Sequence, residues 1–378
     1  MANAGTEPQR VTLEQAFHHG RMLQAEGKLA EAGRIFEQIL VRVPHHTESL
    51  TLLASTCYQR GEDTQGDAYV KRAIEVLRGY LERTPNAAPG QALLANLLLA
   101  RGHREEAEGI CERLFLPLNP IRMSAAEFNE RRQSAALAGL PPMIVNTLPK
   151  SASESIWNQL AEGLGLGQAH ISLGLFPDCC VLGPRAQALG QGGVITKEHI
   201  PATDHNLRML AENGVKRLVF HQRDPRQATL SWAHFVRDDV SMRLMAPLWR
   251  RIVPPASVLR QGELAPVVDW AIEHYLPLLV AFVEGWLEVE RSGAHGMEVL
   301  FMDFETFRRT PEAYRDRVLA FHEIDPARFR RTEAEEAQVV HLRKGEIEEW
   351  RRVFTPAQQE RAFAALPPAL AERFGWAA

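Results

Sequence analysis

Cysteine is scarce in this chain. The 378 residues contain only four, at positions 57, 111, 179 and 180, and no two of them have the spacing of a zinc site or of a CxxC redox motif. We therefore expect four reduced thiols. A charge excess is lacking too, because 43 Lys and Arg oppose 47 Asp and Glu, which gives a net charge of −4. Without a basic excess, nucleic-acid binding is not expected.

Long apolar runs are also missing. The most apolar stretch, residues 276–286, is too short to span a bilayer and contains Glu284. Residues 1–11 are polar and lack the apolar core of a signal peptide. No cluster of metal-ligand residues is visible. These observations predict a cytoplasmic protein with no membrane segment and no metal.

Small residues recur at a fixed spacing in the first 120 residues. Gly27 and Ala32, Gly61 and Gly66, and Gly102 and Ala107 are each five positions apart. The second unit follows the first after 34 residues (27 to 61) and the third after 41 (61 to 102), so about seven residues are inserted near 78–87. The apolar period is helical, and we expect each unit to be a pair of helices.

Within the first unit, the residues at the turn, packing and terminating positions are Gly20, Gly27, Ala32, Phe36 and Pro44. On these residues the segment 13–120 resembles tetratricopeptide repeats, which stack helix pairs into a common core. The resemblance implies a surface for a protein partner or for a homodimer. An unspecialised helical bundle remains the alternative, because the later units lack the aromatic and proline positions.

The pattern changes after Pro141-Pro142. Short apolar runs at 143–147, 193–196, 217–221 and 298–302 predict strands, and 153–164, 202–213, 225–236 and 263–291 predict the helices between them. This alternation predicts an α/β fold with a parallel sheet covered by helices on both faces. We place a repeat domain at 10–120, a helical connector at 121–140 and the α/β domain at 141–378.

Four polar segments in the second half carry the chemistry. The first, Lys150-Ser151-Ala152-Ser153-Glu154-Ser155, joins a predicted strand to a predicted helix, where backbone N–H groups can hold a phosphate. The second places Arg223 at the end of a strand and Ser231 eight residues later. The third is Arg343-Lys344-Gly345, and the fourth is Lys197-Glu198-His199. A histidine on such a loop suits general-base work.

In order and character, these segments resemble the sulfotransferase family that uses 3′-phosphoadenylyl sulfate (PAPS). Pro149-Lys150-Ser151 is similar to its 5′-phosphosulfate loop. Arg223 and Ser231 have the spacing of its 3′-phosphate pair, and Arg343-Lys344-Gly345 with Trp350 is similar to its second 3′-phosphate motif. Residues 197–201 resemble the segment with the catalytic base.

The resemblance implies a P-loop-like parallel sheet, PAPS as co-substrate and no metal. It implies that His199 is the general base and that Lys150 and Lys197 are catalytic cations. The nucleotide would be bound by the loop, the pair and the basic motif: Lys150, Ser151, Ala152, Ser153, Ser155, Arg223, Ser231, Arg343, Lys344 and Gly345. The sequence does not identify the acceptor, which could be a peptide or protein, a carbohydrate or a small molecule.

Two residues depart from the family's loop. Ala152 stands where the family has glycine, and Glu154 puts a negative charge where it has threonine. If the loop keeps the family's register, the Glu154 side chain has to point away from the phosphosulfate. These departures motivate an alternative function, a repeat-based scaffold whose nucleotide-binding domain is catalytically degenerate. An ATP-dependent phosphotransferase is disfavoured because the loop lacks Gly-Lys-Ser/Thr.

Overall fold

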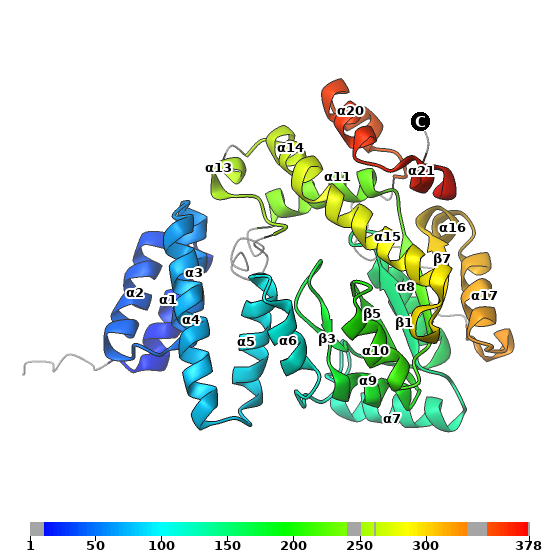
Figure 1. Ribbon diagram of the computed structural model, residues 1–378, viewed down its shortest axis with the longest axis horizontal. Coiled ribbons are helices and arrows are strands. Elements are labelled where there is room, and N and C mark those ends of the chain that lie inside the picture. Colours follow the sequence, from blue (N-terminus) through cyan, green and yellow to red (C-terminus); the bar gives the residue numbers. More distant parts are fainter. Residues whose placement is uncertain (1–10, 240–250, 261, 331–345, 377–378) are drawn as a thin grey trace, which may run out of the picture.

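The computed structural model describes residues 11–239, 251–260, 262–330 and 346–376. An all-helical region comes first, and an α/β region follows it (Figure 1). The helices of the first region are α1 Leu13–Ala25, α2 Leu29–Arg42, α3 Thr47–Arg60, α4 Asp63–Arg83, α5 Ala88–Ala100 and α6 Arg104–Cys111. Helix α7 (Ala125–Leu137) lies in the predicted connector.

The predicted helix pairs are present. Helices α1 and α2, α3 and α4, and α5 and α6 pack as neighbours along the chain. Gly27, Gly61 and Gly102 follow the first helix of each pair, with φ of 76°, 82° and 78°, a conformation that favours glycine. The expected insertion lengthens α4, which has 21 residues where α2 has 14.

Small residues allow close helix packing in this region. A Cβ on Gly20 would lie 2.7 Å from the ring of Phe36, and one on Gly66 would lie 2.6 Å from the ring of Tyr58. Phe36 is fully buried and also meets Phe17, with ring centroids 6.1 Å apart. The geometry shows stacked helix pairs, and the narrower assignment to tetratricopeptide repeats remains a prediction.

The second region is built on a five-stranded parallel sheet in the order β2-β5-β1-β6-β7. The strands are β1 Met143–Thr147, β2 Gly167–Gln168, β5 Val194–Glu198, β6 Arg217–Gln222 and β7 Glu298–Asp303, with a separate antiparallel pair of β3 Ser172–Leu173 and β4 Cys180–Val181. The α/β class with a parallel sheet is thus confirmed. Sequence patterning missed β2, β3 and β4, because two residues are too few to show a period.

Helices cover both faces of this sheet (Figure 1). The helices of the α/β region are α8 Ser153–Leu164, α9 Gly183–Gly190, α10 Asp204–Glu212, α11 Pro225–Asp238, α13 Ala256–Leu259, α14 Leu264–His274, α15 Leu276–Ser292, α16 Phe304–Arg309, α17 Pro311–Phe321, α19 Trp350–Val353, α20 Pro356–Ala364 and α21 Pro368–Phe374, with short 3₁₀ turns η1 Ala294–Gly296 and η2 Pro326–Arg328.

Alternate strand residues enter two cores. Val145 and Val219 face the core shared with α8 and α17, whereas Ile144 and Phe220 face the core shared with α10, α11 and α15. This two-sided burial explains why the strands read as continuous apolar runs. Strand β1 lies between β5 and β6, so the strand order reverses there, and open parallel sheets bind ligands at such a point.

One stretch of the described residues, Leu264–Ser292, is long and apolar enough to cross a membrane by length and composition; the mean hydropathy of its most apolar 18-residue window is 1.3. Its most apolar window is 56% buried inside the protein. It comprises α14 and α15, which pack on α11 and β7. The four cysteines are buried and none forms a disulfide.

Candidate active site

The loop between β1 and α8 has a tightly turned backbone. Lys150 and Ala152 both adopt left-handed φ values, 67° and 70°. Such values cost a non-glycine residue roughly 1–2 kcal/mol, so the surrounding contacts must hold them. Inside the turn the Ser151 hydroxyl donates to the Leu148 carbonyl at 2.5 Å. Ala152 is the N-cap residue of α8 and stands where the resembling family has glycine, the residue that this φ favours.

A buried histidine fixes the loop to the sheet. His221 Nε2 donates to the Ser151 carbonyl at 2.7 Å, while its Nδ1 accepts from the Tyr314 hydroxyl at 3.1 Å. Burial lowers the pKa of His221 to about 4, so the ring is neutral near pH 7, in keeping with one donor and one acceptor nitrogen. Sequence reasoning assigned neither His221 nor Tyr314 a role, although His221 lies two positions before Arg223.

Arg223 joins three segments that are far apart in the chain. Its Nη1 donates to the Lys150 carbonyl at 3.2 Å, and its Nη2 donates to the Glu346 carbonyl at 2.5 Å. The guanidinium stacks 4.0 Å from the ring centroid of Phe304, and the residue is only 5% exposed. The first and second predicted segments therefore meet at one place, at the carboxyl ends of β1 and β6.

Helix α11 brings Ser231 to the same site. The Lys150 Nζ lies 4.0 Å from the ring centroid of Phe235. Ser231 precedes Phe235 by one helical turn and so shares its face of α11. The helix is capped by Asp224, which accepts from the Arg226 backbone N–H at 2.8 Å.

The third predicted segment, Arg343-Lys344-Gly345, lies outside the described residues. The structure resumes at Glu346, whose carbonyl accepts from Arg223. Trp350 follows and is fully buried against α11, where its backbone N–H donates to Gln227 Oε1 at 3.1 Å.

His199 lies at the end of β5, next to the end of β1. Its Nδ1 is 2.7 Å from the Thr147 carbonyl oxygen. Because a carbonyl only accepts, Nδ1 must carry the proton, which leaves a lone pair on Nε2. Burial, followed by the positive charge of Lys197, lowers the pKa of His199 to about 4. The side chain is nevertheless partly exposed, so the neutral imidazole can be reached from outside the protein.

Glu154 forms an ion pair with Lys197, one of the two predicted catalytic cations. Its carboxylate pairs with Lys197 Nζ and with Arg122, 3.0 Å away. Burial alone would raise the pKa of Glu154, but the charges of Lys197 and Arg122 lower it on balance. The side chain thus points at two cations, and the structure gives Lys197 an anionic partner that the sequence did not reveal.

Trp157 is buried and donates to the Ile195 carbonyl at 3.0 Å, which makes it a core residue.

A fully buried carboxylate, that of Glu198, orients the neighbouring hairpin. Glu198 accepts from the Ile171 N–H at 2.7 Å and from the Ser172 hydroxyl at 2.6 Å. Burial would raise the pKa of Glu198, but hydrogen bonds from His170 and the hydroxyls hold it at about 2. Farther along the hairpin, Gly174 donates its N–H to Asn96 of α5 at 2.9 Å.

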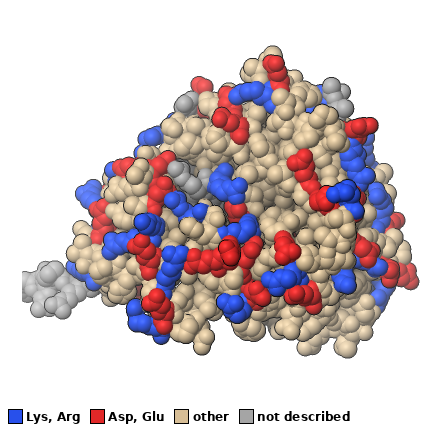
Figure 2. All heavy atoms as spheres, viewed as in Figure 1, with Lys and Arg blue, Asp and Glu red and all other residues tan. Residues whose placement is uncertain are grey.

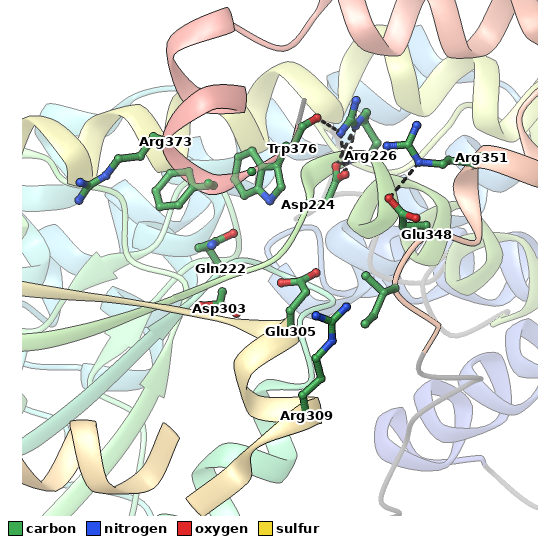
Figure 3. A pocket seen from close by; sticks show the side chains of 13 residues that line it. Gln222, Asp224, Arg226, Asp303, Glu305, Arg309, Glu348, Arg351, Arg373 and Trp376 are labelled. Carbon is green, nitrogen blue, oxygen red and sulfur yellow. Dashed lines mark hydrogen bonds and ion pairs between the residues drawn. The ribbon is translucent and has the colours of Figure 1, made fainter. Parts of the chain in front are cut away.

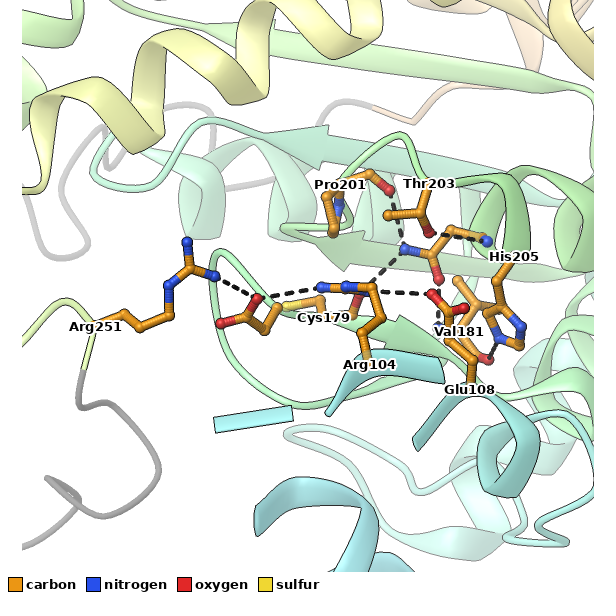
Figure 4. Close-up of polar contacts among 10 residues, drawn as sticks. Arg104, Glu108, Cys179, Val181, Pro201, Thr203, His205 and Arg251 are labelled. Atoms are coloured by element: carbon orange, nitrogen blue, oxygen red, sulfur yellow. Dashed lines mark hydrogen bonds and ion pairs between the residues drawn. The ribbon is translucent and has the colours of Figure 1, made fainter. Parts of the chain in front are cut away.

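Asp178 and Asn206 fix the rest of this hairpin, and Figure 4 shows their partners Arg104, Arg251 and Val181. Asp178 pairs with Arg104 of α6 at 3.3 Å and with Arg251 at 2.6 Å, and Asn206 of α10 accepts from the Val181 N–H at 2.8 Å. The hairpin therefore connects the helical region to the segment that carries His199.

A separate cavity of about 610 Å³ opens at the carboxyl ends of β6 and β7 (Figure 3). It lies between these strand ends, α16 and the C-terminal helices. Lys and Arg are interspersed with Asp and Glu over the face of the molecule in Figure 2.

A comparison with solved structures found similar chains, among them a mouse sulfotransferase. Mouse sulfotransferase SULT7A1 complexed with PAP is 14% identical, with a TM-score of 0.39, and the match covers 66% of this chain and 93% of that chain. No protein-family model matches the sequence. No curated protein matches it either.

Proposed function

We propose that this protein is a sulfotransferase that moves a sulfuryl group from PAPS to an acceptor hydroxyl or amine. One observation carries the proposal: Arg223 bonds to the Lys150 carbonyl at 3.2 Å, so the two segments that resemble the phosphosulfate loop and the 3′-phosphate pair form one cationic site. That site lies at the point where the strand order reverses.

The residues present fit a doubly phosphorylated nucleotide. The strand-to-helix loop offers backbone N–H groups, and Lys150 adds a cation for the 5′ side. Arg223 and Ser231 are the ligands that we propose for the 3′-phosphate, with Arg343, Lys344 and Gly345 as a third group. Arg223 now donates to two backbone carbonyls, and a phosphate is a better acceptor for a guanidinium because the hydrogen bonds become charge-assisted.

PAPS supplies an activated sulfuryl group. The chain's own residues position it, and His199 Nε2 takes the proton of the acceptor. The Thr147 carbonyl keeps Nδ1 protonated and so keeps Nε2 in its basic form. Lys150 would balance charge on the departing phosphate. Lys197 would act on the sulfuryl oxygens only when it is released, at least in part, from Glu154.

The Glu154–Lys197 ion pair also favours the second candidate, a repeat-based scaffold with a degenerate nucleotide-binding domain, because it neutralises a proposed catalytic cation. Thermal unfolding with added nucleotide distinguishes the candidates. Selective stabilisation by adenosine 3′,5′-bisphosphate supports the sulfotransferase site, and stabilisation by ATP alone supports a phosphotransferase. No stabilisation by either nucleotide supports the scaffold. A screen of acceptors with labelled donor then tests transfer itself.

The role of the helical region is a separate proposal. Stacked helix pairs offer a surface for a protein or peptide, or for a second copy of the chain. The contacts of the hairpin with α5 and α6 connect that region to the segment of His199. We propose that the acceptor is presented, or the chain dimerised, through this region in the cytoplasm.

A further inference from the structure

Among the described residues, the cavity at the carboxyl ends of β6 and β7 shares no lining residue with the proposed nucleotide site. Its lining includes Gln222, Asp303, Glu305 and Arg309, together with residues of the C-terminal segment, and does not include Lys150, Ser231 or His199. Its volume of about 610 Å³ is in the range of small-molecule sites.

A buried amide at the floor of the cavity points to a ligand. Gln222 is 3% exposed, and none of the described residues donates a hydrogen bond to its Oε1. Figure 3 shows its side chain among those that line the cavity, next to Asp303. A buried carbonyl oxygen that lacks a donor costs about 1–3 kcal/mol, and a ligand with an N–H group would remove that cost.

Two residues of opposite charge in the same cavity form no ion pair with the described residues. They are Glu305 and Arg309, which lie four residues apart on α16. In the described part of the chain, neither residue forms an ion pair, with the other or with a third residue. Other charged side chains of the lining have partners: Asp224 pairs with Arg226, Glu348 pairs with Arg351, and the Asp303 carboxylate accepts from the N–H and the hydroxyl of Thr306. Burial raises the pKa of Glu305, and the charge of Asp303 raises it further, so a positive group beside this carboxylate would be stabilised.

We propose that this cavity binds a small zwitterion of the amino-acid class. Its ammonium group donates to Gln222 Oε1 and to the Glu305 carboxylate, and its carboxylate meets the exposed Arg309 at the mouth. An organic ammonium is favoured over a metal ion, because no group of three or more potential ligand residues in the described chain could hold one.

Arg223 separates this site from the nucleotide site. Its guanidinium stacks on Phe304, and the neighbours of Phe304 in the sequence, Asp303 and Glu305, line the cavity. The two sites are therefore adjacent, but the zwitterion site does not depend on the proposed nucleotide chemistry.

Isothermal titration of the full chain with L-alanine, L-lysine and L-arginine, each alone, tests the proposal. We expect saturable binding of at least one of them, weakened roughly tenfold or more by Glu305→Gln and by Arg309→Ala, since each removes a charged hydrogen-bonding partner. Glu312→Gln, which changes an exposed carboxylate on the next helix, should leave the affinity unchanged. The carboxamide of the amino acid that binds should bind more weakly and should be insensitive to Arg309→Ala.

Absence of binding by all three amino acids at millimolar concentration would overturn the proposal. Binding that neither charge variant affects would overturn it too. Gln222→Met provides an independent variant if Glu305→Gln fails to fold, and it too should weaken binding. Stabilisation of the same samples by adenosine 3′,5′-bisphosphate is read separately, so loss of the zwitterion site and failure of the proposed function are distinguishable.

Discussion

Removal of the Arg223 guanidinium should weaken nucleotide binding in a way that depends on the 3′-phosphate. A hydrogen bond to a charged group contributes about 1.5–3 kcal/mol, which corresponds to roughly 10- to 150-fold in the dissociation constant. We therefore expect Arg223→Ala to raise the dissociation constant of adenosine 3′,5′-bisphosphate by that factor. The affinity for adenosine 5′-monophosphate, which lacks the 3′-phosphate, should fall much less.

The comparison of the two nucleotides is needed because Arg223 also supports the loop. Its contact with the Lys150 carbonyl means that the variant loosens the 5′ side as well, and the monophosphate measures that part alone. Arg217→Ala is the matched control, because it removes an arginine from the other end of β6, where it pairs with Glu323 at the surface. Isothermal titration gives all the constants. An equal loss of affinity for both nucleotides would refute the assignment of Arg223 to the 3′-phosphate.

Three further predictions concern the base, its pKa and the C-terminal helices. His199→Ala should lower turnover by roughly 10²–10⁴-fold and leave bisphosphate affinity nearly intact; turnover close to the parent's in a labelled-donor assay would exclude it as the base. Because the pKa of His199 is about 4, the base is lost only as pH falls through that value. Lys197→Met should raise the pKa and move the acidic limb of kcat/KM to higher pH, and an unmoved limb would contradict that electrostatic role. Arg226→Met should lower the free energy of unfolding by about 3–5 kcal/mol, because it removes the buried guanidinium that pairs with the Asp224 carboxylate and donates to the Trp376 carbonyl. Denaturant unfolding measures this loss, and the more exposed Arg351→Met, as control, should show a much smaller one.

The sequence was sufficient where the physical signal is local. The apolar run at 143–147 is β1 and the amphipathic pattern at 153–164 is α8, with the same bounds in the structure. In the structure, α20 likewise begins at a local signal, because Thr355 accepts from the Gln358 N–H in a capping box and Pro356 is the first helical residue. Such signals depend on residues that are close together in the chain.

The site was predicted in its parts rather than in its contacts. Lys150, Arg223 and His199 were singled out because each follows a strand, and parallel strands place their carboxyl ends at one edge. The partners of these residues come from elsewhere: Thr147 for His199, Glu346 for Arg223 and Phe235 for Lys150. No local pattern marks a backbone carbonyl as an acceptor for a distant guanidinium.

The amino-acid order alone determined the class of fold, the repeating helix pairs and which segments carry cationic and basic side chains, because periodicity and composition are written along the chain. Only the tertiary structure decided that Glu154 neutralises Lys197, that His221 and Tyr314 brace the loop, and that Gln222 and Glu305 share a cavity with Arg309. These arrangements depend on which strand lies beside which and on the direction of each side chain, and both are set by packing between residues far apart in sequence.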